Sequence, residues 1–177
     1  MDQITKDRIA ASIEHFRLPA YEAIPDVGLY LEQTAKYISD YLAPLHIAPV
    51  TGSMISNYVK KGLISSPVRK QYSREQIAYL IFIAVAKLVM SMDDLHLMME
   101  IQRETYPADV AYEYFRKELD RVLRFVFGSA GELDALGSDA SDEKIMLRNA
   151  IITAAHKLYL DQLFLALRGE STENSKE

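Results

Sequence analysis

Apolar residues recur at steps of three and four along most of the chain, which is the spacing of one face of an α-helix. This spacing predicts an amphipathic helix within the first sixteen residues and a second helix over residues 29–42, which Pro44 ends. A short third helix follows, with Thr51 or Ser53 as its N-cap. Gly62 stands where the C-terminal cap of that helix belongs.

The most apolar segment lies near the middle of the chain. Ser73 opens it with a capping box, and the residues that follow are apolar all round the helix axis, which predicts a central buried helix. Ser91 caps the next helix, and a helix of about twenty residues runs from Pro107 to Gly128. A last long helix is expected over residues 142–168, after an acidic and polar hinge.

Residues 63–72 differ from these segments because they carry no helical pattern. Pro67 interrupts them, and the surrounding Ser, Arg and Lys residues predict a tight loop or a small two-stranded wing. The chain is therefore expected to be all-α, with at most a small two-stranded wing, and its last residues, 171–177, to form a disordered tail.

Composition narrows the class of protein. About half of the 177 residues are apolar and a quarter are charged, as in soluble helical domains. The absence of cysteine excludes a disulfide framework, thiolate zinc sites and cysteine nucleophiles. The first twelve residues are charged and polar, and no run of apolar residues approaches the ~18 that a membrane span needs. We therefore expect a cytoplasmic protein that does not contact a membrane.

Charge is distributed unevenly. The net charge is −5, yet the residues from Thr51 to Arg74 hold five basic and no acidic side chains, which leaves −10 on the remainder. Such a local excess favours a surface that binds a polyanion, on a body that otherwise repels one. The alternative is a solvated charged loop with no partner.

The order of helix, turn, helix, basic loop and capped helix is typical of a winged helix-turn-helix that binds double-stranded DNA. Short polar side chains at the start of a recognition helix reach base edges, and a carboxamide such as that of Asn57 can bond an adenine edge twice. Asn57 is equally compatible with an ordinary solvated helix position. Cations on the helix end and the wing meet phosphates. The candidate contacts are Thr51, Ser53, Ser56, Asn57, Lys60, Lys61, Arg69, Lys70 and Arg74.

A series of spaced residues runs through the same segment. It comprises Ile55, Tyr58, Gly62-Leu63-Ile64, Pro67, Arg69, Tyr72-Ser73, Glu75, Ile77, Leu80, Phe82-Ile83 and Ser91-Met92-Asp93-Asp94-Leu95. The series resembles the DNA-binding domain of MerR-type regulators. The resemblance implies that Tyr58 packs or contacts a phosphate, and that Arg69, Lys70 and Tyr72 are wing contacts. One departure is Ser56, which stands where MerR-type proteins commonly place an arginine.

The whole chain resembles more closely an uncharacterised bacterial family, Domain of Unknown Function 1836. In that family a segment like SMISNYVKKGLI precedes one like YSREQIAYLIFI. This resemblance implies a fold and no established activity.

Other candidate chemistry is weak. The four histidines are far apart in sequence, and the acidic clusters occupy a helix start and the hinge, so neither an enzyme nor a metal or cofactor site is expected. Methionines and aromatic residues after Ser73 could form a pocket for a small apolar effector, or simply pack the core. These are Met90, Met92, Met98 and Met99 with Tyr79 and Phe82, and the later Tyr106, Tyr112, Tyr114 and Tyr159.

We expect four regions: an N-terminal helical arm (1–28), a winged helix-turn-helix domain (29–104), a C-terminal helical region (105–170) and the tail. The hypothesis is a transcriptional regulator that binds double-stranded DNA as a homodimer through its C-terminal helices. The last helix carries more apolar surface than one contact face uses, and either a dimer interface or the core of the same chain would bury the excess. The alternative is a protein-interaction adaptor that has kept the winged fold and lost its DNA contacts, which Ser56 favours.

Overall fold

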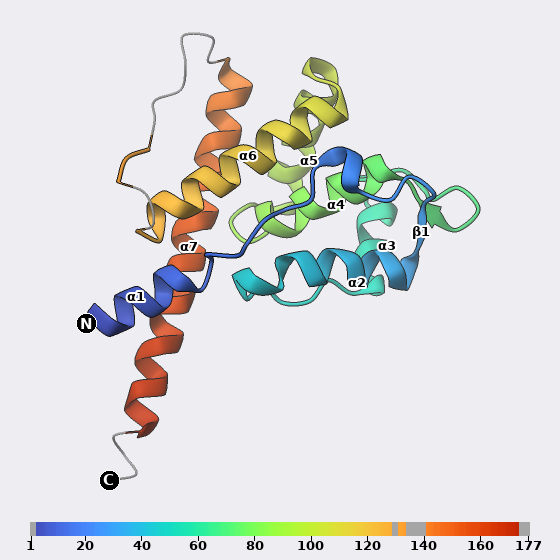
Figure 1. Cartoon of the computed structure of the whole chain (residues 1–177). Helices are drawn as coiled ribbons and strands as arrows, with labels where there is room; N and C mark the ends of the chain where they lie inside the picture. Colours follow the sequence, from blue (N-terminus) through green and yellow to red (C-terminus); the bar gives the residue numbers. More distant parts are fainter. Residues whose placement is uncertain (1–2, 129–130, 134–140, 174–177) are drawn as a thin grey trace.

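The computed structural model describes residues 3–128, 131–133 and 141–173, and within them the protein is helical apart from one two-stranded sheet (Figure 1). The fold class expected from the sequence is confirmed. The helices are α1 (Gln3–Ala11), α2 (Leu31–Leu42), α3 (Gly52–Lys60), α4 (Arg74–Ala86), α5 (Met92–Thr105), α6 (Ala108–Val126) and α7 (Asp142–Glu173). The strands are β1 (Leu29–Tyr30) and β2 (Gln71–Tyr72), and single 3-10 turns occur at η1 (Tyr21–Ala23) and η2 (Ala43–Leu45).

Three helices begin at the N-caps that the sequence predicts. The Thr51 hydroxyl accepts the backbone N–H of the residue three positions on, and Ser91 does the same for α5. At Ser73 the capping box is complete, because the Gln76 side chain also accepts the Ser73 N–H at 2.9 Å. Each such cap contributes about 1 kcal/mol to helix stability. The starts of α3, α4 and α5 are therefore fixed locally.

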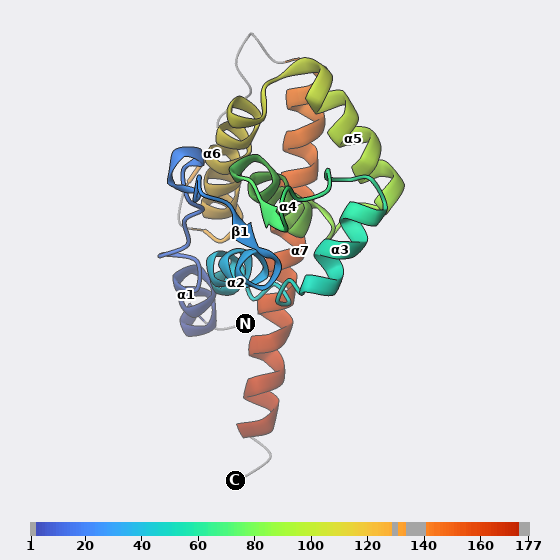
Figure 2. The same cartoon turned by 90° about the vertical axis from the view of Figure 1, so that its right-hand side faces the viewer.

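α4 is the central helix, as its apolar composition predicts. It packs against α2 on one side and against α6 and α7 on the other (Figures 1 and 2). Ile77, Ile81 and Ile83 are fully buried, and Phe82 meets Phe115 of α6 edge to face, with ring centroids 5.3 Å apart. Full burial of each isoleucine side chain contributes about 1.5–3 kcal/mol to the free energy of folding. The buried cluster is continuous from α1 to α7, so it crosses the expected boundary near residue 104.

The small sheet differs from the wing that the sequence predicts. β2 pairs antiparallel with β1, with Leu29 opposite Tyr72, and not with a second strand inside residues 63–72. Within that loop, one isolated bridge joins Val68 to Gln71 around a tight turn. The pairing with β1 ties the loop to the segment just before α2, so the wing is anchored by a partner distant in sequence.

The segment before β1 lies along α6. The Tyr112 hydroxyl donates to the Pro19 carbonyl at 3.0 Å, and the Tyr21 N–H donates to the Glu113 carboxylate at 2.8 Å. The first helix ends at Ala11, earlier than the spacing of its apolar residues predicts. The buried anchors of this arm are Ile9, Ile13 and Phe16.

α7 packs along α6 and then extends beyond the body of the protein (Figures 1 and 2). A buried ion pair joins the two helices, with the Arg148 Nε 2.9 Å from a Glu118 carboxylate oxygen. Farther along, Leu160, Phe164 and Leu165 are 45%, 50% and 55% exposed, and we call these three residues the apolar ridge. Of the apolar residues that the sequence predicts on this helix, Ile151, Ala154 and Leu158 are buried in the core of the chain, whereas Leu165 is exposed in the apolar ridge.

The ends of α7 differ from the sequence-based expectation. The helix continues to Glu173, five residues beyond the expected end and into the expected tail of 171–177. Residues 174–177 of that tail lie outside the described residues, as do 129–130 and 134–140 of the expected hinge.

One helix among the described residues has the length and composition of a candidate membrane span. Within Asp142–Arg168, the most apolar window of 18 residues has a mean hydropathy of 1.2, and 28% of that window is buried inside the protein. This segment contains no long run of consecutive apolar residues, because polar side chains interrupt it. A core helix meets the same criterion, and α7 packs against α1, α4 and α6.

Candidate functional site

α3 presents an apolar face to the core and a polar face to solvent. Ile55 and Tyr58 are buried beneath it. Ser53, Asn57 and Lys60 are exposed on the opposite side. A helix of this kind is held by its inner face alone, so its outer face is free to contact a partner.

The approach of α2 to α3 is close and specific. A Cβ on Gly52 would lie 2.5 Å from a Glu32 carboxylate oxygen and 3.2 Å from the Leu31 side chain, so the start of α3 sits directly against α2. The Ser39 hydroxyl also accepts the Val50 N–H at 3.0 Å, which fixes the end of the connection between the helices. The pair of helices is therefore locked in one relative orientation.

α3 ends in a Schellman motif, which sets the direction of the chain toward the wing. Gly62 has a φ of 75°, its N–H donates to Val59, and the Leu63 N–H donates to Tyr58. Leu63 and Tyr58 are both buried, which supplies the hydrophobic contact that usually accompanies this motif. The predicted glycine cap is confirmed.

The tip of the wing is a two-residue turn made of two cations. Arg69 and Lys70 have φ values of 51° and 66°, and the Gln71 N–H donates to the Val68 carbonyl at 2.9 Å. Two successive positive φ angles are typical of a type I′ turn, which usually holds Asn-Gly or Gly-Gly. Residues with a Cβ are held there at a cost of about 1 kcal/mol each. Strain of this kind is often found at functional sites.

The cations of this region form no ion pair within the part of the chain that the structure describes. This holds for Lys60, Lys61, Arg69 and Lys70, all of which are exposed. Elsewhere basic side chains on α4, α6 and α7 do pair with carboxylates. The carboxylate of Glu32 lies against the start of α3.

Eight of the eleven candidate residues are exposed on α3, at its two ends and on the wing tip, and these elements lie on the same side of the molecule (Figures 1 and 2). We call this set the basic face. It consists of Thr51, Ser53, Ser56, Asn57, Lys60, Lys61, Arg69 and Lys70.

The other three candidates do not fit a role as DNA contacts. Tyr58 and Tyr72 are 2% and 4% exposed, and burial raises the pKa of Tyr72. Of the two roles implied for Tyr58, the structure supports packing. Arg74 donates to the Ile24 carbonyl at 3.0 Å and pairs with Glu22 at 2.5 Å, so it fastens the N-terminal segment to α4.

Sequence reasoning missed one feature of the wing tip. Val68 is 74% exposed beside Arg69, although an apolar residue is normally expected to be buried. The left-handed turn that exposes it has no signal in the sequence, because neither Arg nor Lys is typical of that conformation.

No group of three or more His, Asp or Glu side chains that could hold a metal ion occurs among the residues that the structure describes. The chemistry available at the basic face is therefore that of hydroxyls, one carboxamide and four cations. Groups of these kinds are those that contact phosphates in protein–DNA complexes.

Comparisons with known proteins give a family and no activity. No curated protein and no solved structure shows significant similarity to the chain. A family model matches residues 19–115, just over half of the 177 residues, and the match covers both elements of the basic face but neither α1 nor α7. The chain belongs to the family described as Domain of unknown function (DUF1836).

Proposed function

We propose that the protein is a transcriptional regulator that binds double-stranded DNA through a MerR-like winged helix-turn-helix. The observation that carries this proposal is the basic face, where four exposed and unpaired cations flank a polar helix in a protein of net charge −5. Phosphates neutralise such cations, and the release of counterions from DNA drives binding.

The dimensions of α3 suit the major groove. An α-helix with its side chains is about 10–12 Å in diameter, and the groove is about 12 Å wide. The nine residues of α3 extend about 13 Å at 1.5 Å per residue. Ser53, Ser56 and Asn57 lie on the outer side of this helix, where base edges would be reached. The side chains are short enough for the backbone of α3 to approach the bases closely.

The cations lie where the DNA backbone would pass. Lys60 and Lys61 are at the end of α3, and Arg69 and Lys70 are at the tip of the wing. Phosphates run along both edges of the groove, so two separate pairs of cations fix the orientation of a helix inserted between them. The order of strand, helix, helix, wing and helix is similar to that of MerR-type DNA-binding domains.

The proposed functional unit is a homodimer that forms through the apolar ridge. A second copy of α7 would cover Leu160, Phe164 and Leu165, and a two-fold arrangement would present two basic faces to successive major grooves. Most helix-turn-helix proteins bind half-sites in this way.

Binding to fluorescent duplexes, measured by anisotropy, tests the proposal. A Lys60→Glu, Lys70→Glu variant should lose at least tenfold in affinity for every duplex, because each reversed cation removes a phosphate contact. The matched control is Lys6→Glu, Lys117→Glu, which makes the same charge change at exposed residues of α1 and α6. Equal losses in both variants would show that net charge acts, and not the basic face.

Base reading has a separate test. After a preferred duplex is selected from a random pool, Asn57→Ala should reduce the preference for one base pair about tenfold or more and leave the salt dependence unchanged. An unchanged preference would remove Asn57 from the base-reading residues.

The second candidate function is a protein-interaction adaptor. Two observations favour it: Ser56 replaces the arginine common in MerR-type proteins, and the carboxylate of Glu32 lies against the start of α3. If the protein is an adaptor, no DNA duplex should bind to it even at low salt. The Phe164→Glu variant should then no longer bind the protein partner that docks on α7.

A further inference from the structure

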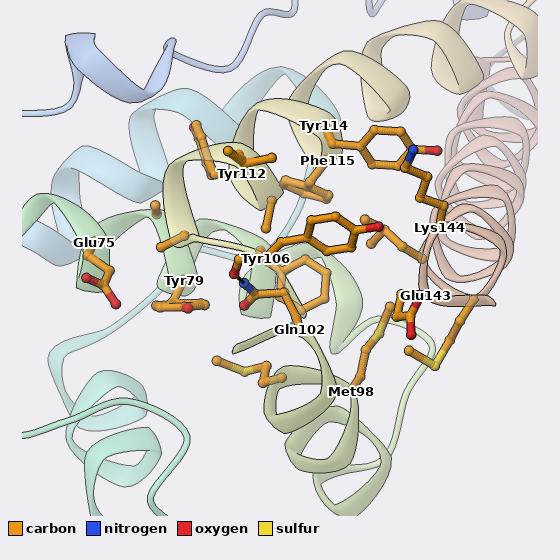
Figure 3. A pocket seen from close by; sticks show the side chains of 18 residues that line it. Glu75, Tyr79, Met98, Gln102, Tyr106, Tyr112, Tyr114, Phe115, Glu143 and Lys144 are labelled. Carbon is orange, nitrogen blue, oxygen red and sulfur yellow. Dashed lines mark hydrogen bonds between the residues drawn. The ribbon is translucent and has the colours of Figure 1, made fainter. Parts of the chain in front are cut away.

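A cavity lies between α4, α5, α6 and the first turns of α7, away from the basic face (Figure 3). Its volume is about 110 Å³. Most of its wall is aromatic or thioether, supplied by Tyr79, Phe82, Met98, Tyr106, Tyr112 and Phe115. Most of the methionines and aromatic residues that the sequence suggests for a pocket line this cavity. Met90, Met92 and Tyr159 do not line it.

The cavity is not simply a packing fault in the core. Figure 3 shows the Tyr106 ring between Phe115 and Met98, with its hydroxyl directed toward the α7 side. That hydroxyl lies 3.3 Å from Ser141, so it keeps capacity for another hydrogen bond. At the same end, Tyr114 holds a buried hydroxyl with no hydrogen-bond partner among the described residues. Apolar walls with a few polar groups at one end are typical of small-molecule sites.

We propose that this cavity binds a small planar compound, a single ring in size, that carries a hydrogen-bonding group at one edge. An apolar cavity of about 150 Å³ takes up benzene, so a space of about 110 Å³ limits the ligand to one ring. The facing rings of Phe82, Tyr106 and Phe115 offer edge and face contacts that an aromatic ligand uses better than an aliphatic one. The hydroxyl of Tyr106 would meet the polar edge.

One residue of α5, Arg103, joins the wall of this cavity to the joint between α3 and the wing. The Arg103 guanidinium lies 5.0 Å from the centroid of the Tyr79 ring, which lines the cavity, and it donates to the Leu63 carbonyl just beyond the end of α3. Gln102 lines the cavity itself and donates to the Tyr106 carbonyl at 2.9 Å. A ligand that moves Tyr79 therefore shifts Arg103 and the joint between α3 and the wing. This second step, from ligand to DNA affinity, rests on the proposed function.

The binding step is tested without DNA, with phenol as the probe. In a spectrum of ¹³C-labelled methionine methyl groups, phenol should shift Met98, Met99 and Met146, which line the cavity, and leave Met54 and Met92 in place. Shifts of equal size at all five methyl groups, or no shift at about 1 mM phenol, would overturn the proposal.

A variant that fills the cavity provides a second readout. Ala111→Trp on α6 should weaken phenol binding about tenfold or more, whereas the matched control Leu97→Trp, at an exposed residue of α5 outside the cavity, should not. Equal affinity in both variants would place the ligand elsewhere. If the Ala111→Trp variant does not fold, the methionine shifts of the unmodified protein alone show whether the ligand binds in the cavity.

The coupling step is tested by DNA titrations with and without saturating phenol. The DNA affinity should change about fivefold or more in the unmodified protein, and Arg103→Ala should remove this change while phenol still binds. An unchanged DNA affinity would overturn the coupling alone. If no duplex binds under any condition, the proposed function fails, while the methionine shifts still decide the ligand site.

Discussion

The basic face and the apolar ridge are both exposed, but exposure has opposite consequences for them. The cations of the basic face are well hydrated, so leaving them in water costs nothing until a polyanion displaces the counterions. The three apolar side chains of the ridge lose about 25 cal/mol of stabilisation for each Å² left in water. The first surface thus suits a reversible and salt-sensitive partner, and the second suits a permanent one.

The largest effect is expected on the ridge. Phe164→Glu with Leu165→Glu should raise the dimer dissociation constant by about 10²-fold or more, because two buried apolar contacts are each worth about 1.5–3 kcal/mol. Sedimentation equilibrium measures the change, and a Val27→Glu, Leu97→Glu variant, at exposed apolar residues outside α7, serves as the control. A monomeric unmodified protein at micromolar concentration would contradict the dimer.

The joint between α3 and the wing comes next. Gly62→Ala should lower the free energy of unfolding by about 1–2 kcal/mol, since Gly62 has a φ of 75° that disfavours a Cβ. Gly131→Ala is the control, because open space surrounds that position and its φ is not in the left-handed region. Urea midpoints of the two variants give the comparison, and equal midpoints would exclude strain at Gly62.

The wing tip should show a conflict between stability and binding. Arg69→Asn with Lys70→Gly provides the residues that a type I′ turn prefers, so the free energy of unfolding should rise by about 1 kcal/mol. DNA affinity should fall at the same time, because two cations are lost. Thermal unfolding and anisotropy on the same variant test both statements. A variant that is more stable and binds DNA with unchanged affinity would show that the wing tip does not contact DNA.

The smallest effect concerns Glu113, which touches neither surface. Hydrogen bonds from Arg116 hold the pKa of Glu113 below its usual value, and the Tyr21 N–H adds to this effect. Because the folded-state pKa is depressed, the stability from this group is present above the unfolded-state pKa near 4.5 and is lost as pH falls through the lower folded-state value.

Glu113→Gln should therefore reduce the acid dependence of stability by about 0.5 kcal/mol, a small value because the side chain is partly exposed. Urea unfolding at neutral and acid pH measures the difference. An identical pH dependence in both proteins would show that the anchor contributes nothing through its charge.

Local features of the fold could be predicted from the sequence. The caps at Thr51, Ser73 and Ser91 and the glycine end at Gly62 depend on side chains within three residues of the helix end, so the pattern contains the information. The pairing of β1 with β2 could not be predicted, because it joins residues more than forty positions apart and each strand has only two residues.

The candidate site shows the same division. Exposure of the serines, Asn57 and the lysines of α3 follows from helical spacing, which the sequence contains. Arg74 was assigned to the DNA contacts by its charge, but its partners, Glu22 and Ile24, lie about fifty residues away. The positive φ angles of Arg69 and Lys70 depend on the pairing of the whole loop, and the cavity depends on four helices packing together.

The most direct test of the central claim is the salt dependence of DNA binding by the unmodified protein. Four phosphate contacts from each protomer, made by Lys60, Lys61, Arg69 and Lys70, give eight in the proposed dimer, and they predict that a plot of log K against log salt concentration has a slope of about −7. The Lys70→Ala variant should make that slope shallower by about two units, one for each protomer. A slope near zero, or no binding at low salt, would contradict the assignment of the basic face to DNA.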